Sequence, residues 1–148
     1  LVLAEGVASL AGPLWPIFAP LIGAMGSFMA GSATISNMMF SLFQFASAEE
    51  IGLGSGGAAW VVALQVVGGA AGNMICVHNV VAASATVGLA GREGDLIRKA
   101  LIPMGYYVLA AGTVGMAFIV GGLNSWFAVW LLVVLGSLVL MRLGRARR

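Results

Sequence analysis

The sequence predicts an all-helical integral membrane protein that contains a re-entrant helical hairpin and a discontinuous transmembrane helix. Of its 148 residues, 61% are hydrophobic and only 8% are charged, whereas a soluble domain carries about 25% charged residues. The mean hydropathy of +1.05 agrees with a membrane protein. Two polar stretches flanked by glycine, 31–37 and 72–79, interrupt the apolar sequence. Irregular backbone at membrane depth persists only where protein or a watery cavity surrounds it, so both stretches predict broken helices.

The first segment, 1–12, is interpreted as the end of a preceding helix. It begins without Met and has no basic region ahead of an apolar one, so we expect no signal peptide. The single cysteine, Cys76, excludes an internal disulfide. We expect residues 1–148 to be one membrane domain, the C-terminal fragment of a longer protein.

Residues 13–48 predict the re-entrant hairpin. Three prolines near its start suit a loop followed by an opening helical turn. A helix over 16–30 would be about 22 Å long and a helix over 37–48 roughly 18 Å, and neither crosses a hydrocarbon core of about 30 Å. The two lengths therefore suit a hairpin with 31–37 at its tip. A single kinked span is the alternative.

Residues 57–90 predict the broken transmembrane helix, after a polar, glycine-rich connection at 49–56. As one straight helix, 57–90 would be about 51 Å long, which is too long for a single crossing. We expect a helix to about Gly72, an unwound stretch, and a second half-helix from about Asn79.

Two ordinary transmembrane helices are expected at 96–120 and 124–141. The charged run 91–99 before them is interpreted as an interfacial loop that enters a helix. This loop and the C-terminal tail hold all the Lys and Arg residues of the chain, and such residues favour the cytoplasmic side. We therefore expect a cytoplasmic C-terminus, with Glu49 and Glu50 outside and the hairpin entering from the outer side.

The two breaks predict a site for a small anion. An unwound stretch exposes backbone N–H groups, and the N-terminus of a half-helix carries partial positive charge. Short polar side chains occur in both breaks: Ser32, Thr34, Ser36 and Asn37 in the first, and Asn73 and Asn79 in the second. The alternative is that these side chains only satisfy one another at helix kinks.

His78, the one histidine of the chain, lies in the second break. Imidazole groups titrate near neutral pH, which suits proton coupling, and ionisable groups at membrane depth are functional candidates. A neutral histidine bonded to a nearby carbonyl is the alternative.

The sequence contains no recognised arrangement of catalytic residues. The sequence has no HExxH motif, cysteine cluster or P-loop, and no Gly-x-Ser-x-Gly followed by a suitable acid and base. We therefore expect no catalytic residues, no metal and no cofactor. The basic tail is too short for a nucleic-acid surface, so the expected surroundings are membrane lipid and not nucleic acid.

Two runs resemble the L-lactate permease family. They are GSFMAGSATISNMMF at 26–40 and VALQVVGGAAGNMICVHNVVAASATVGLAGREG at 62–94. The resemblance extends from about Pro13 to Ala111. It implies a secondary transporter that imports L-lactate, or a related 2-hydroxy-monocarboxylate such as glycolate, together with protons across the plasma membrane.

The resemblance also implies a fold and a substrate site. The family belongs with ion-transporter-like folds of inverted repeats that contain re-entrant hairpins, and this chain looks like the C-terminal repeat, which would pair with the remaining N-terminal half. By position, the implied substrate-binding residues are Gly31, Ser32, Thr34, Ser36 and Asn37 at the hairpin tip, and Gly72, Asn73, His78 and Asn79 in the broken helix.

One position departs from the family pattern. The hairpin tip usually reads Gly-Ser-Asn-Thr or Gly-Ser-Asp-Thr, whereas residue 33 is Ala here. The missing polar side chain bears on substrate choice and on coupling. Two alternatives therefore stay open: a sodium-coupled di- or tricarboxylate transporter of similar architecture, and a non-transporting membrane assembly module.

Overall fold

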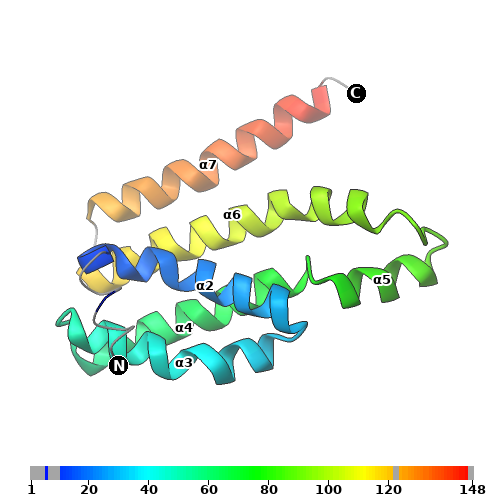
Figure 1. Cartoon of the computed structure of the whole chain (residues 1–148). Helices are drawn as coiled ribbons and strands as arrows, with labels where there is room; N and C mark the ends of the chain where they lie inside the picture. Colours follow the sequence, from blue (N-terminus) through cyan, green and yellow to red (C-terminus); the bar gives the residue numbers. More distant parts are fainter. Residues whose placement is uncertain (1–5, 7–10, 122–123, 147–148) are drawn as a thin grey trace.

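The computed structural model describes residues 6, 11–121 and 124–146, without the side chains of 140, 141 and 143–146. A 3-10 turn, η1 (Gly12–Leu14), precedes six α-helices: α2 (Trp15–Ala30), α3 (Ala33–Glu50), α4 (Gly54–Asn73), α5 (Val77–Thr86), α6 (Glu93–Val120) and α7 (Ser125–Ala146) (Figure 1). The preceding helix that was expected over 1–12 falls largely outside the described residues.

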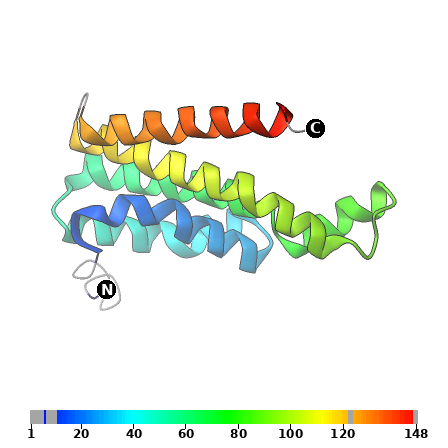
Figure 2. The same cartoon turned by 90° about the horizontal axis from the view of Figure 1, so that it is seen from above.

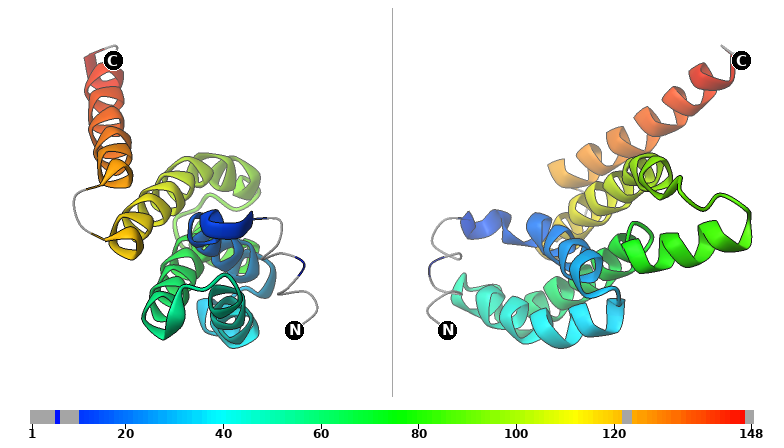
Figure 3. Two further views of the ribbon diagram at one scale, coloured as in Figure 1. Left: turned by 90° about the vertical axis from the view of Figure 1, so that its left-hand side faces the viewer. Right: turned by 45° about the vertical axis from the view of Figure 1, so that its right-hand side comes forward.

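The helices alternate in direction along most of the chain. Figures 1 and 2 show α2 and α3 joined at one end by a tight turn, and α4 returning alongside them. The chain then continues through α5, which extends beyond the α2–α3 turn, and α6 runs back along both α4 and α2. Helix α7 packs against α6 on the outside of this group (Figure 3).

The core lies between α2, α3 and α4, toward the end where α3 turns into α4. Its buried apolar side chains are Trp15, Ala19, Ala48, Ala58, Val61 and Leu64. Trp15 meets Phe43 edge to face, with ring centroids 5.7 Å apart. Half of these residues are alanine, so the three helices approach one another closely, as helices in membranes often do.

Helices α2 and α4 touch backbone to backbone through glycine. A Cβ atom added at Gly68 would clash with the carbonyl of Pro20, and one at Gly72 would clash with the carbonyl of Ala24. A third glycine, Gly23, faces the backbone of Gln65 in the same way. The Gly-rich stripe of α4 is therefore the surface on which the hairpin arm α2 lies.

Three helical segments in the described residues are long and apolar enough to cross a membrane: Gly12–Ala30, Gly54–Asn73 and Glu93–Val120. A shorter apolar helix runs over Ser125–Val139. Helix α3 has 18 residues but is more polar, with several buried polar side chains on the face that meets α2 and α4. The all-helical architecture agrees with an integral membrane protein.

Both breaks are shorter than the sequence predicted. The structure is irregular at residues 31–32, where 31–37 was expected, because Ser32 caps α3 and the helix begins at once. The Ile35 N–H donates to Ser32 Oγ at 3.4 Å, which satisfies one free donor of the first turn.

The second break covers 74–76, where 72–79 was expected. Gly72 stays helical because it packs on the backbone of Ala24. Helix α4, with 20 residues, is about 30 Å long by itself, which matches the thickness of the hydrocarbon core. The break therefore follows a full-length helix.

Candidate functional site

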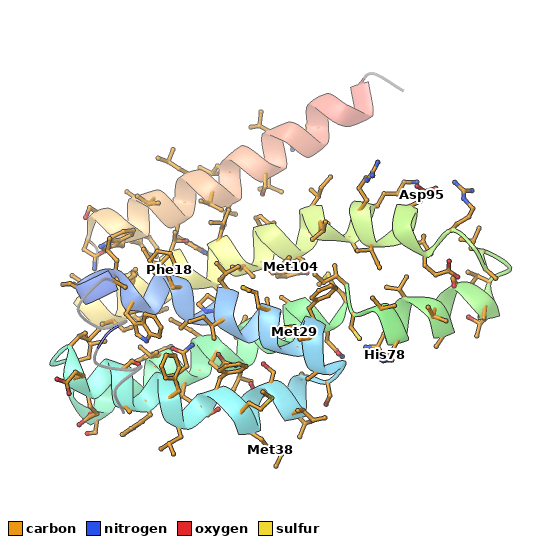
Figure 4. The ribbon with its side chains drawn as sticks, viewed as in Figure 1. Phe18, Met29, Met38, His78, Asp95 and Met104 are labelled. Carbon is orange, nitrogen blue, oxygen red and sulfur yellow. The ribbon has the colours of Figure 1, made fainter. Side chains whose placement is uncertain are left out.

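The two breaks meet in the folded chain. Gly31 ends α2 in the left-handed conformation, with φ of 73°. A Cβ atom at this position would lie 2.9 Å from Nδ1 of His78 and 3.5 Å from Sγ of Cys76. Figure 4 shows His78 at the start of α5, beside the end of the hairpin. The tip of the hairpin therefore touches the break between α4 and α5, more than forty residues along the chain.

Two helix N-termini converge at this contact. Helix α3 starts at Ala33, two residues after Gly31, and α5 starts at Val77, between Cys76 and His78. Cys76, which precedes α5, is extended and makes no capping hydrogen bond with its side chain. Neither helix has an acidic residue in its first turn. The junction thus combines two partial positive charges with backbone N–H groups, the arrangement that favours a carboxylate.

Polar side chains surround the junction on the α5 side. Asn79 donates through Nδ2 to the backbone oxygen of Asn73 at 3.1 Å and to its Oδ1 at 3.0 Å, and so bridges the second break. His78 is exposed, and its Nδ1 lies 3.5 Å from Sγ of the buried Cys76. The sequence left open a neutral histidine bonded to a backbone carbonyl. In the structure the imidazole contacts a thiol instead.

On the hairpin side, Ser32 is half-buried and Thr34 is exposed. Both belong to the first turn of α3 or its cap, next to Gly31. Asn37 is partly buried, and its Oδ1 lies out of reach of solvent with no hydrogen-bond partner. This oxygen lies 3.3 Å from where a Cβ of Gly69 would be, so it faces α4.

Ser36 has a different environment from the other residues of the first break. It is fully buried, donates to the carbonyl of Gly23 at 2.9 Å and accepts from Nε2 of Gln65 at 3.2 Å. Its hydroxyl is therefore occupied by contacts between helices. Gly31, Ser32, Asn73, His78 and Asn79 lie at or directly beside the two breaks, and Thr34 lies in the first turn of α3. Asn37 faces α4 at Gly69, and Gly72 packs on the backbone of Ala24 in α2.

Sequence reasoning did not select two buried amides that lie along α3 and α4, away from the junction. Gln44 and Gln65 are both fully buried, and Nε2 of Gln44 donates to Oε1 of Gln65 at 3.1 Å. A single amide in the middle of an apolar helix is the signal that could have pointed to each. Their partnership joins α3 to α4 across 21 residues of sequence, which no local pattern predicts.

Among the described residues, no group of three or more His, Cys, Asp or Glu side chains is placed to hold a metal ion. The chemistry at the junction is that of hydrogen-bond donors and helix dipoles around a small anion. Helix breaks of this kind between apolar helices agree with an integral membrane protein.

The comparison with known sequences supplies the family. The chain belongs to the L-lactate permease family, whose pattern matches residues 1–121. This confirms the resemblance found at 26–40 and 62–94. No solved structure shows a significant match to the chain.

Several curated proteins are similar to this chain. A putative L-lactate permease of Haemophilus influenzae is 43% identical over 113 residues, which are 76% of this chain and 20% of that protein. The L-lactate permease of Escherichia coli K12 is 38% identical over 87 residues, or 59% of this chain and 15% of that protein. A glycolate permease of the same strain is 36% identical over 87 residues, which are again 59% of this chain and 15% of that protein. The chain thus spans a fifth or less of the length of these relatives.

Proposed function

We propose that the protein is a multi-pass secondary transporter of the plasma membrane that takes up L-lactate, or a related 2-hydroxy-monocarboxylate such as glycolate, together with protons. Membership of the L-lactate permease family supports this proposal, as do the names of the lactate and glycolate permeases among the relatives. The observation that carries it is the contact of Gly31 with Cys76 and His78, because this contact joins the N-termini of α3 and α5.

In the proposed site, the substrate carboxylate lies between these two N-termini and accepts from their backbone N–H groups. Glycine at 31 lets His78 lie close to the backbone of the hairpin tip, since a side chain there would meet the imidazole. Ser32 and Thr34 supply hydroxyl donors from the hairpin. His78 and Asn79, both exposed on α5, are proposed to bind the 2-hydroxyl group.

Asn73 and Asn37 have supporting roles in this proposal. Asn73 receives both bonds of Asn79 and so holds the start of α5. Asn37 presents a carbonyl oxygen without a partner toward α4, available to a donor when the hairpin moves. Ser36 contributes through helix packing, because its hydroxyl is already occupied. The hairpin is proposed to be re-entrant, and the N-terminal half of the protein completes the site from the other side.

Uptake of labelled L-lactate by cells that express the full protein tests the proposal. We expect uptake to rise when the external medium is acidified, to fall with a protonophore, and to be inhibited by glycolate. Uptake that changes with neither the external pH nor the protonophore would contradict proton coupling. Sodium-dependent succinate uptake without competition from lactate would favour the di- or tricarboxylate alternative. Correct membrane insertion without uptake of either solute would favour the assembly module.

Two asparagine substitutions test the site itself. Asn37→Ala and Asn73→Ala should each reduce lactate uptake severalfold while membrane insertion is retained. The first removes a polar group that faces α4, and the second removes the side-chain partner of Asn79. Ser137→Ala is the matched control, since Ser137 bonds to the carbonyl of Val134 in its own helix, α7. Normal uptake by both asparagine variants would place the site elsewhere.

A further inference from the structure

A chain of hydrogen bonds between fully buried side chains links the three helices of the core. Nε2 of Gln44 in α3 donates to Oε1 of Gln65 in α4 at 3.1 Å. Nε2 of Gln65 donates to Oγ of Ser36 in α3 at 3.2 Å, and Ser36 donates to the carbonyl of Gly23 in α2 at 2.9 Å. Gln44, Gln65 and Ser36 are each 0% exposed.

The direction of donation is the same along the whole chain. Each amide gives a hydrogen to the next group, and the last hydroxyl gives its hydrogen to a helix carbonyl. A shift of α3 by one residue would rotate its side chains by about 100°, so Gln44 and Ser36 would leave Gln65 together. Buried polar groups have their best-attested role in fixing such a register.

The chain is poorly suited to stabilising the fold alone. Oε1 of Gln44 is buried without a partner, and its Nε2 also reaches the carbonyl of Ala19 only at 3.5 Å. An unpaired polar atom in a dry interior is costly, and apolar side chains of similar size often replace such networks without loss of stability. The geometry therefore favours a role in specifying the arrangement of the helices.

Register matters because of what lies at the end of α3. Ser36 is one helical turn from Ala33, where α3 begins, and that N-terminus faces the break between α4 and α5. We propose that Gln44 and Gln65, acting through Ser36, are positioning residues that hold the N-terminus of α3 against Cys76 and His78. The expected effect on lactate uptake rests on the proposed function. The expected effect on the position of the hairpin tip does not.

Disulfide cross-linking measures the position of the tip directly. A Cβ at Gly31 lies 3.5 Å from Sγ of Cys76, so Gly31→Cys should form a disulfide with the native Cys76 upon mild oxidation. The rate of disulfide formation is compared between two proteins, one with native Gln44 and Gln65 and one with both residues changed to Met. The side chain of Met has a similar unbranched shape. Loss of free thiols to a maleimide reagent gives the readout in the full protein in membranes. The double variant Gly31→Cys/Cys76→Ala cannot form this disulfide and gives the baseline maleimide signal.

We expect the Gln44→Met/Gln65→Met pair to slow cross-linking on the order of tenfold while thermal unfolding in detergent occurs at the same temperature or higher. In the native Gly31 background, the same pair should raise KM for lactate on the order of tenfold, because small misplacements of binding groups are costly. Thr113→Val is the matched control. Thr113 is also buried but bonds to carbonyls of its own helix, so it should change neither quantity.

The outcomes separate the two proposals. Unchanged cross-linking in the Met pair would overturn the positioning role. Slower cross-linking in a protein whose wild type takes up no lactate would support the positioning role and refute the proposed function. A lower unfolding temperature with unchanged cross-linking would show that the network serves stability alone.

Discussion

At the scale of single residues, glycine decides how closely α2 and α4 approach. Gly68 and Gly72 leave no room for a methyl group, because the backbone of α2 occupies that space. Gly105 in α6 has the same helical setting, but an added Cβ meets nothing within 4 Å. The two kinds of glycine cannot be told apart from sequence, since both lie inside apolar helices.

Gly68→Ala should therefore destabilise the protein by about 1–3 kcal/mol or more, because the methyl group would force α2 away from α4. Gly105→Ala should be neutral or stabilise it by up to roughly 1 kcal/mol, since alanine is the better helix former. Thermal unfolding of the purified protein in detergent compares them. Equal unfolding temperatures for the two variants would contradict the backbone contact.

Residue 33 illustrates how position in a helix changes the meaning of a motif. The resemblance to the family implies Asn or Asp here, whereas this chain has Ala33 as the first residue of α3. Ser32, which precedes it, already caps the helix. The hairpin tip thus keeps its cap and its glycine turn without the polar side chain, so the shape of the tip depends on Gly31 and Ser32.

At the scale of elements, a carboxylate fixes the turn between α5 and α6. Oε1 of Glu93 accepts from the N–H of Gly91 at 2.9 Å and from Oγ of Ser84 at 3.1 Å. Ser84 is fully buried at the α5 side of this clamp. Helix α5 packs against α6, and so its orientation at the junction with the hairpin depends on this turn.

Glu93→Ala should loosen α5, because both bonds are lost, whereas Glu93→Gln retains an acceptor and should have a smaller effect. Limited proteolysis at residues 87–92 measures the change, with cleavage faster in the Ala variant. Asp95→Ala is the control, since Asp95 pairs with Arg92 at 3.4 Å on an exposed surface, where ion pairs contribute about 0–1 kcal/mol. Equal cleavage of all three variants would show that Glu93 does not hold the turn.

The breaks show where element boundaries escape local reasoning. Both interruptions lie within the ranges that the sequence predicts, but those ranges extend into α3, α4 and α5, because polar residues there are helical and not irregular. Ser36 and Asn37 are helical because their side chains find partners or neighbours on α2 and α4. A polar residue in an apolar segment marks a break or a helix contact, and only the neighbouring helix distinguishes the two.

At the scale of the whole molecule, the charged segments lie at opposite ends of the helix bundle. The turn between α5 and α6 and the C-terminal end of α7 share one end, while the turn after α3, with Glu49 and Glu50, lies at the other (Figure 1). The hairpin therefore approaches the junction from the end opposite to the basic residues. With the positive-inside rule, this arrangement suits a cytoplasmic C-terminus.

Labelling of introduced cysteines tests this orientation. Glu50→Cys should react with a membrane-impermeant maleimide added to intact cells, whereas Arg92→Cys should react only after the cells are opened. Both positions are exposed, and the native Cys76 is buried, so the unmodified protein provides the background. Labelling of Arg92→Cys in intact cells would show the opposite topology, with the turn between α5 and α6 outside.

The sequence by itself determined the class of the protein, its family and the approximate places of both breaks, because hydropathy, glycine and polar residues act locally along the chain. Only the tertiary structure decided that the breaks meet at Gly31, Cys76 and His78, and that the side chain of Ser36 bonds across helices. The physical reason is that these contacts depend on how α2 and α4 approach one another. That distance is set by which glycines face another backbone, a relation between residues far apart in the chain.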